Sequence, residues 1–222
     1  MLAMKTMWWK ILAVLLVLYS IIAAFLMPAP DDLGILRQTV RNLHFHVPMW
    51  FGMISVLLGS FFFSLKYLRT NQPREELYAN SMIQVALFFG FMGLLTGSTW
   101  ARFTWTAWWT PDPKLNGAAI GVLIYIAYNI LRNSLKENEV KMHKIGSVYN
   151  ILAFPIFLSL ILIIPKVANY SLHPGSGDTV GFSSYDLNND LRKVFYPAVV
   201  GWILIGFWLA QLNFRIQILK NE

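Results

Sequence analysis

Cysteine is absent from the 222 residues, so the chain forms no disulfide bond, supplies no thiolate ligand to a metal and performs no thiol redox chemistry. Charged residues are also scarce, at 13% of the sequence. The scarcity is most pronounced in the long apolar runs, whose central parts contain no Asp, Glu, Lys or Arg. Because proton-coupled pumps and ion transporters place ionisable groups at membrane depth, these runs predict no buried proton relay.

Hydrophobic residues make up 56% of the chain and fall in runs longer than the core helix of a soluble protein needs. A membrane-spanning helix takes roughly 20 mainly apolar residues and satisfies its own backbone hydrogen bonds in lipid. We therefore predict an all-α integral membrane protein, a bundle of about six transmembrane helices in one polytopic domain over residues 1–222. The spans are expected near residues 11–27, 46–65, 82–97, 117–131, 145–164 and 196–214.

The lysines and arginines are divided unevenly between the two sides of these spans, with 11 of the 18 on one side. Because the more basic side of a membrane protein faces the cytoplasm, both termini are expected there. The segments at about 28–46, 98–116 and 165–195 then lie on the outer face. The net charge of +7 comes with no basic stripe, so we expect contact with membrane lipid and not with nucleic acid.

The outer segment 98–116 is unusual because it carries four tryptophans within ten residues, namely Trp100, Trp105, Trp108 and Trp109. On a helix the last three would share one face, and Pro111 would end that helix. We expect a short amphipathic element whose indole rings form a surface for a flat, apolar ligand. Anchoring at the membrane interface is the alternative explanation. Asp112 followed by Pro113 predicts the start of the fourth span, with Asp112 as its N-cap.

Two histidines, His46 and His173, lie on the same predicted face and each is close to a proline. Together with the indole rings they predict axial ligation of an iron porphyrin, which leaves two positions open on its metal. His44 would point elsewhere on a helix, and His143 is expected to be solvated in a basic loop of the other face. Haem propionates favour basic partners, for which the outer-face candidates are Arg102, Lys114, Arg37 and Arg41.

On these residues the chain resembles the cytochrome c maturation protein C family of haem exporters, whose Trp-rich loop is known as the WWD motif. The resemblance covers the six spans, the His46-Val47-Pro48 entry to the second span and the Leu172-His173-Pro174 segment. It implies that His46 and His173 are the axial ligands. It also implies that the motif residues bind haem, namely Trp100, Trp105, Trp108, Trp109, Asp112, Lys114 and Leu115. The chain departs from the usual pattern at Ala101 and Thr106, which replace glycines, and at Pro111, which replaces a tryptophan.

The resemblance also implies a function and a set of partners. The chain would be a haem-binding delivery protein of the bacterial cytoplasmic membrane without catalysis of its own, with haem b as its cargo. It would present haem at the periplasmic face to a haem chaperone during c-type cytochrome assembly, together with ATP-binding cassette transporter subunits and a small membrane subunit. Three alternatives stay open: a subunit of a system II cytochrome c synthetase, a non-haem metal site formed by His44, His46 and His173, and a helical scaffold with an aromatic loop.

Overall fold

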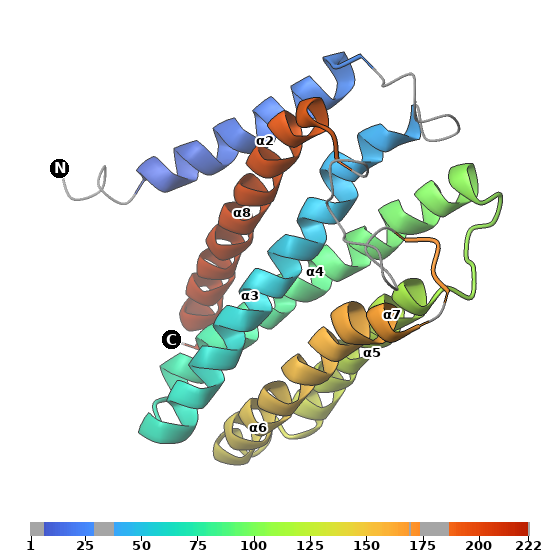
Figure 1. Cartoon of the computed structure of the whole chain (residues 1–222). Helices are drawn as coiled ribbons and strands as arrows, with labels where there is room; N and C mark the ends of the chain where they lie inside the picture. The colour runs from blue at the N-terminus through green and yellow to red at the C-terminus, as the bar shows by residue number, and fades with distance from the viewer. Residues whose placement is uncertain (1–6, 29–37, 169, 174–186, 222) are drawn as a thin grey trace.

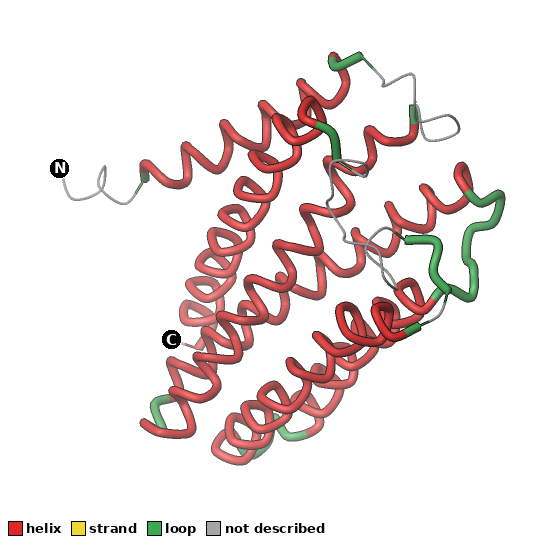
Figure 2. The backbone as a smooth tube through the Cα atoms, viewed as in Figure 1, coloured by secondary structure: helices red, strands yellow, loops and turns green. Residues whose placement is uncertain are grey.

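Six long helices make up most of the computed structural model, which describes residues 7–28, 38–168, 170–173 and 187–221 (Figures 1 and 2). No strand occurs within these ranges. The elements in chain order are α2 (Trp8–Leu26), the 3-10 turn η2 (Thr39–Asn42), α3 (Leu43–Thr70), α4 (Pro73–Thr104), α5 (Pro113–Ser134), α6 (Glu139–Leu158), the π-helical turn η3 (Ser159–Ile163), α7 (Ile164–Val167) and α8 (Asn189–Asn221).

The six helices have the length and apolar composition of membrane spans, which confirms the predicted fold class. The predicted spans fall on these helices, but most of the helices extend further than the apolar runs. For example, α4 begins at Pro73 and carries Glu75 and Glu76 in its first turn. The α-helical pattern of α6, which contains Pro155, changes to the π-helical turn η3 four residues after this proline, at Ser159.

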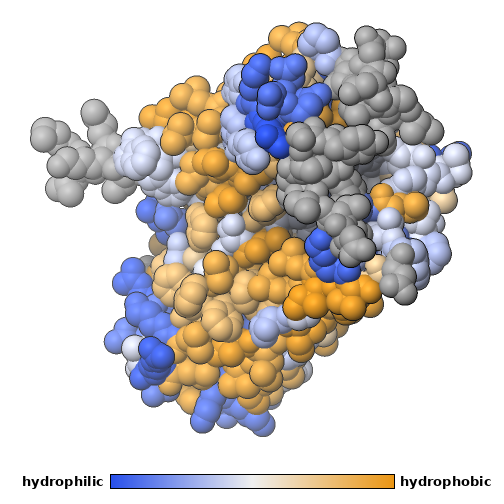
Figure 3. Space-filling view, viewed as in Figure 1, coloured by the Kyte–Doolittle hydropathy of each residue, from blue (hydrophilic) through white to orange (hydrophobic). Residues whose placement is uncertain are grey.

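The helices pack as two connected groups. α3 lies against α4 and α8, α5 lies against α6 and η3, and α3 also contacts α6 (Figure 1). The core between them contains fully buried side chains such as Met53, Leu57, Phe89, Tyr125 and Phe157. The space-filling view shows hydrophobic residues spread across the flank of α6 and α7, with hydrophilic residues gathered near the α3–α4 turn (Figure 3). This distribution is the one expected for a bundle surrounded by lipid.

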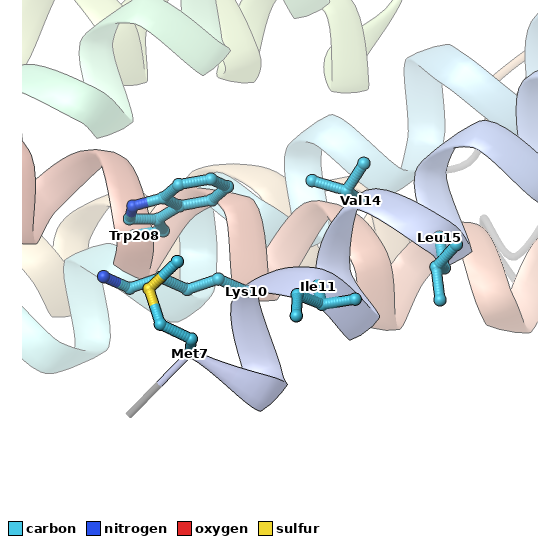
Figure 4. A pocket seen from close by; sticks show the side chains of 6 residues that line it. All are labelled: Met7, Lys10, Ile11, Val14, Leu15 and Trp208. Carbon is cyan, nitrogen blue, oxygen red and sulfur yellow. The ribbon is translucent and has the colours of Figure 1, made fainter. Parts of the chain in front are cut away.

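The first helix, α2, packs against α8. Gly201 permits the close approach, because a Cβ atom there would lie 3.0 Å from Val17 Cγ2 and 3.2 Å from the Val17 backbone nitrogen. Near the start of α2, the Lys10 ammonium lies 5.6 Å from the ring centroid of Trp9. It also lies 5.5 Å from the ring centroid of Trp208, toward which the Lys10 side chain extends in Figure 4. The Lys10 side chain is only 9% exposed, and these cation–π contacts stabilise its ammonium group beside apolar surface.

Small residues also determine the packing of α5. A Cβ atom at Gly117 would lie 2.3 Å from the Leu160 carbonyl oxygen, and one at Gly121 would lie 2.5 Å from the Phe157 ring. These two glycines, four residues apart, therefore bring α5 into direct contact with the end of α6 and with η3, as small residues at this spacing do in membrane helices.

A buried ion cluster joins α4, α5 and α6 at the end of the bundle away from the Trp-rich loop. The Glu76 carboxylate is 1% exposed and accepts hydrogen bonds from Arg132 Nε at 2.9 Å and Nη2 at 3.0 Å. His143 Nδ1 contacts the same carboxylate. The prediction that His143 is solvated is wrong, because α6 starts at Glu139 and its second turn directs this side chain, 5% exposed, toward α4.

Candidate histidine and tryptophan site

His46 lies in the second turn of α3, where the side chain faces α4. Its Nδ1 is 3.1 Å from Thr96 Oγ1, and the Thr96 hydroxyl is 2.8 Å from the Met92 carbonyl. A hydroxyl has one hydrogen, which here goes to that carbonyl, so Thr96 Oγ1 accepts the hydrogen bond from His46 Nδ1. The neutral His46 ring consequently carries its lone pair on Nε2, which makes Nε2 the nitrogen able to ligate a metal.

A row of glycines on α4 provides the space for this ring. A Cβ atom at Gly97 would lie 2.6 Å from His46 Cε1 and 3.3 Å from Nδ1. One turn earlier, a Cβ atom at Gly93 would lie 2.7 Å from Trp50, whose ring packs edge-on against His46 at 6.3 Å. The packed structure thus shows that the side chains of His46 and Trp50 occupy the space left by these glycines.

His173 is held by the carboxylate of Asp112. The distance from His173 Nδ1 to Asp112 Oδ1 is 3.1 Å, while Ser171 Oγ and the Leu172 backbone N–H donate to Oδ2 at 2.8 and 2.7 Å. Because a carboxylate only accepts, the His173 Nδ1 carries the proton of this hydrogen bond, and the lone pair of the neutral ring is on Nε2. The two histidines therefore have the same tautomer, one fixed by a hydroxyl and the other by a carboxylate. Metal-ligating histidines are commonly oriented in this way through their second nitrogen.

The same carboxylate caps α5, as the Asp-Pro sequence predicted. Asp112 Oδ1 accepts from the backbone N–H of Lys114 at 2.8 Å and of Leu115 at 3.3 Å. Burial acts to raise the pKa of Asp112, but hydrogen bonds from His173, Leu172 and Ser171 outweigh it and hold that pKa below its usual range. Asp112 is therefore ionised at neutral pH, and its contribution to stability is present above about pH 4 and is lost as the pH falls below that.

The helix expected through Trp105, Trp108 and Trp109 is not present. α4 ends at Thr104 with Trp105 as its C-cap, and Thr106 has a φ of 61°, in the left-handed region. A β-branched residue is strained there, whereas glycine is not, which explains why glycine is the usual residue of the motif at this position. The segment then folds back along α4, because Ser98 Oγ donates to the Trp108 carbonyl at 2.8 Å.

The tryptophans consequently divide into two pairs instead of sharing one face. Trp100 packs edge-on against His46 with ring centroids 6.0 Å apart, and Trp105 packs edge-on against His173 at 5.1 Å. Trp108 and Trp109 are 60% and 43% exposed, and Trp109 Nε1 donates to Asn116 Oδ1 at 3.0 Å. One pair thus supports the two imidazoles, and the other leaves large apolar rings at the surface.

The basic residues predicted near this site have different surroundings. Arg102 Nη1 donates to the Thr106 carbonyl at 2.8 Å and so stabilises the turn that ends α4. Arg41 Nη1 donates to the Phe25 carbonyl at 2.7 Å, at the end of α2. Lys114 is partly buried and interacts electrostatically with Asp112. Arg37 lies outside the described residues.

His44 and His46 are two residues apart on the same helix, α3, and so project from different faces of it. Its side chain is 0% exposed, and neither ring nitrogen has a hydrogen-bond partner. Among the residues that the structure describes, no three His, Cys, Asp or Glu side chains are close enough to hold a metal ion. The geometry therefore gives no support to a metal site formed by His44, His46 and His173.

The site as a whole is assembled at one end of the bundle, at the right of Figure 1. It combines the first turns of α3, the last turns of α4, the start of α5 and residues 170–173. His46 and His173 are near enough to interact electrostatically, although 127 positions of the sequence separate them. The two imidazoles and the exposed indole rings therefore lie at the same end of the bundle.

The chain is similar to known proteins along its whole length. The family model described as Heme exporter protein C matches residues 1–222. The Heme exporter protein C of Bradyrhizobium diazoefficiens is 27% identical over 195 residues, which cover 87% of this chain and 70% of that protein. The one from Haemophilus influenzae is 22% identical, over 83% of this chain and 74% of that protein. The cytochrome c biogenesis protein CcsA of Cuscuta reflexa is 23% identical over 58% of this chain and 42% of its own length.

Proposed function

The chain belongs to the heme exporter protein C family, and on that basis we propose that it binds haem at the periplasmic face of the bacterial cytoplasmic membrane. There it presents haem to a haem chaperone during c-type cytochrome biogenesis. The observation that carries this proposal is the pair of histidines, His46 and His173, each with Nδ1 engaged in a hydrogen bond and the lone pair of the neutral ring on Nε2. Haem offers two axial positions for two such nitrogens.

The surrounding residues fit a flat, apolar cargo with an acidic edge. The exposed rings of Trp108 and Trp109 provide stacking surface, and Trp100 and Trp105 hold the imidazole rings in place. Lys114 and Arg102 lie beside the loop and supply positive charge for the propionates. The charge distribution of the sequence supports placing this end of the bundle outside, with both termini in the cytoplasm.

Removal of the ligands tests the proposal. The purified protein, loaded with haem, is expected to give the Soret and visible bands of low-spin iron with two histidine ligands. His46→Ala and His173→Ala should each shift these bands and weaken haem binding about tenfold, the scale associated with losing one good ligand interaction. Substituting the buried His44 with alanine is the control for loss of a histidine, and its spectrum should keep the wild-type band positions. Wild-type spectra in both ligand variants would refute the assignment.

A second test addresses the space around His46. Gly97→Ala places a methyl group 2.6 Å from the imidazole, so we expect the ring to move, its hydrogen bond to Thr96 to lengthen and haem affinity to fall several-fold. Gly146→Ala is the matched control, because the nearest atom to its added methyl group would be 3.5 Å away. Titration with haem, followed by absorbance, measures both variants. Identical affinities in the two would show that the ring position is unimportant.

The wider assembly is also part of the proposal. The partners implied by a haem exporter are ATP-binding cassette transporter subunits, a small membrane subunit and the periplasmic haem chaperone, to which haem b is transferred as cargo. A role as a subunit of a system II cytochrome c synthetase is the second candidate, favoured only by the partial similarity to the protein CcsA. Transfer of haem from the loaded protein to a soluble chaperone, with no attachment to an apocytochrome, would distinguish the first role from the second.

A further inference from the structure

A second polar site lies at the opposite end of the bundle, where α3 ends, α4 begins and α8 ends. It surrounds a cavity of about 450 Å³ that is open to the surface. The cavity brings together residues from three helices, among them Lys66 of α3, Arg74 of α4 and Arg215 of α8. The last turns of α8 and the α3–α4 turn lie at this end of the bundle, at the lower left of Figure 1.

Positive charge dominates this cavity. Lys66, Arg74 and Arg215 supply three cations, and Glu75 supplies one carboxylate, which pairs with Lys66 at 2.8 Å. The four side chains together leave an excess of two positive charges. An excess of this kind attracts a dianionic or monoanionic ligand, and arginine binds phosphate oxygens with well-defined geometry.

Aromatic rings hold two of these cations in position. The Tyr78 ring packs edge-on against Phe63 at 4.7 Å and against Phe214 at 4.9 Å. The Arg74 guanidinium lies 5.7 Å from the Phe214 centroid, and the Lys66 ammonium lies 5.8 Å from that of Phe63. The cations therefore sit over an apolar floor and are partly ordered before a ligand arrives.

Large apolar side chains that neighbour the cavity-lining residues in the sequence are exposed. Phe62 of α3 is 57% exposed, and Ile216 and Leu219 of α8 are 50% and 69% exposed. These residues belong to helices long and apolar enough to cross a membrane, and the cavity lies at the ends of those helices. A ligand here meets cations at one end and hydrocarbon at the other.

We propose that this cavity binds the phosphate headgroup of an anionic phospholipid of the cytoplasmic leaflet. Arg74 and Arg215 hold the phosphate, and the acyl chains lie along the exposed side chains of α3 and α8. Basic pockets between transmembrane helices on the cytoplasmic side are typical of such lipid sites. This lipid site is separate from the histidine and tryptophan site, which lies at the other end of the same helices.

The test compares lipids on the delipidated protein in detergent, using native mass spectrometry or thermal shift. Phosphatidylglycerol should bind and raise the unfolding temperature, whereas phosphatidylcholine and soluble glycerol phosphate should have little effect. The variant Arg74→Gln/Arg215→Gln should lose about tenfold or more in phosphatidylglycerol affinity, as expected for two cations near the membrane surface. Equal binding of glycerol phosphate would assign the site to a soluble phosphate and overturn the lipid proposal.

Two further variants keep the outcome unambiguous. Lys141→Gln/Lys144→Gln removes two exposed cations from α6 on the same side of the membrane and should leave phosphatidylglycerol affinity unchanged within twofold. Glu75→Gln removes the carboxylate from the cavity and should raise the affinity several-fold. An equal loss in both double variants, or a loss in Glu75→Gln, would mean that the cavity is not the binding site.

Discussion

Replacing Asp112 with alanine is expected to lower haem affinity by about 10- to 100-fold, the range seen when a residue that orients a metal ligand is removed. The carboxylate holds His173 Nδ1 and also the Ser171 hydroxyl and the Leu172 amide, so its loss releases the whole 170–173 segment. The N-cap of α5 is lost at the same time, which should reduce the free energy of unfolding by about 1 kcal/mol. Haem titration and thermal unfolding of the apoprotein measure the two effects separately.

Asp112→Asn distinguishes the two roles of this residue. Asparagine is as good an N-cap as aspartate, so a purely structural role predicts wild-type haem affinity for this variant. If Asp112 orients His173, haem affinity should fall substantially in this variant. Asparagine replaces one carboxylate oxygen with an NH2 group, which donates hydrogen bonds and so does not accept the one from the Leu172 N–H. The pKa of Asp112 lies below its usual range, so this carboxylate stays ionised between pH 6 and pH 8.

Glu76→Ala is expected to lower the free energy of unfolding by about 3–5 kcal/mol, the usual cost of removing one partner from a buried ion pair. The substitution leaves the Arg132 guanidinium, 17% exposed, without its carboxylate, and it also removes the partner of His143. The contacts between α4, α5 and α6 at this end would be lost together. Reversible unfolding in mixed micelles containing sodium dodecyl sulfate measures the change.

The neighbouring residue offers a matched control. Glu75 also forms an ion pair, with Lys66, but the side chain of that lysine is 55% exposed. Glu75→Ala should therefore cost less than about 1 kcal/mol. A double variant with Glu76→Leu and Arg132→Met should recover part of the stability lost in Glu76→Ala, because the Arg132 guanidinium is then not left without its carboxylate. A cost for Glu76→Ala as small as that of its neighbour would contradict a structural role of the cluster.

The fold class was predictable because membrane insertion depends on properties that are local in sequence. A run of about 20 apolar residues must form a helix in lipid, whatever its neighbours are, and the six runs gave six helices. The start of α5 was predictable for the same reason, since Asp112 and Pro113 act within one helical turn. The family resemblance, carried by His46, His173 and the tryptophans, was confirmed by the match over the whole chain.

The tertiary structure decided how those residues are arranged. Helical periodicity predicted one face for Trp105, Trp108 and Trp109, but the left-handed backbone at Thr106 ends that periodicity. His143 was assigned to a loop because the apolar run starts after it, yet α6 begins at Glu139 and pairs this residue with Glu76 on another helix. The partners of His46 and His173, Thr96 and Asp112, lie 50 and 61 positions away along the chain. Hydrophobic patterning fixes which segments enter the membrane, but it contains no information on which buried polar groups pair across helices, because that depends on the packing of all the helices together.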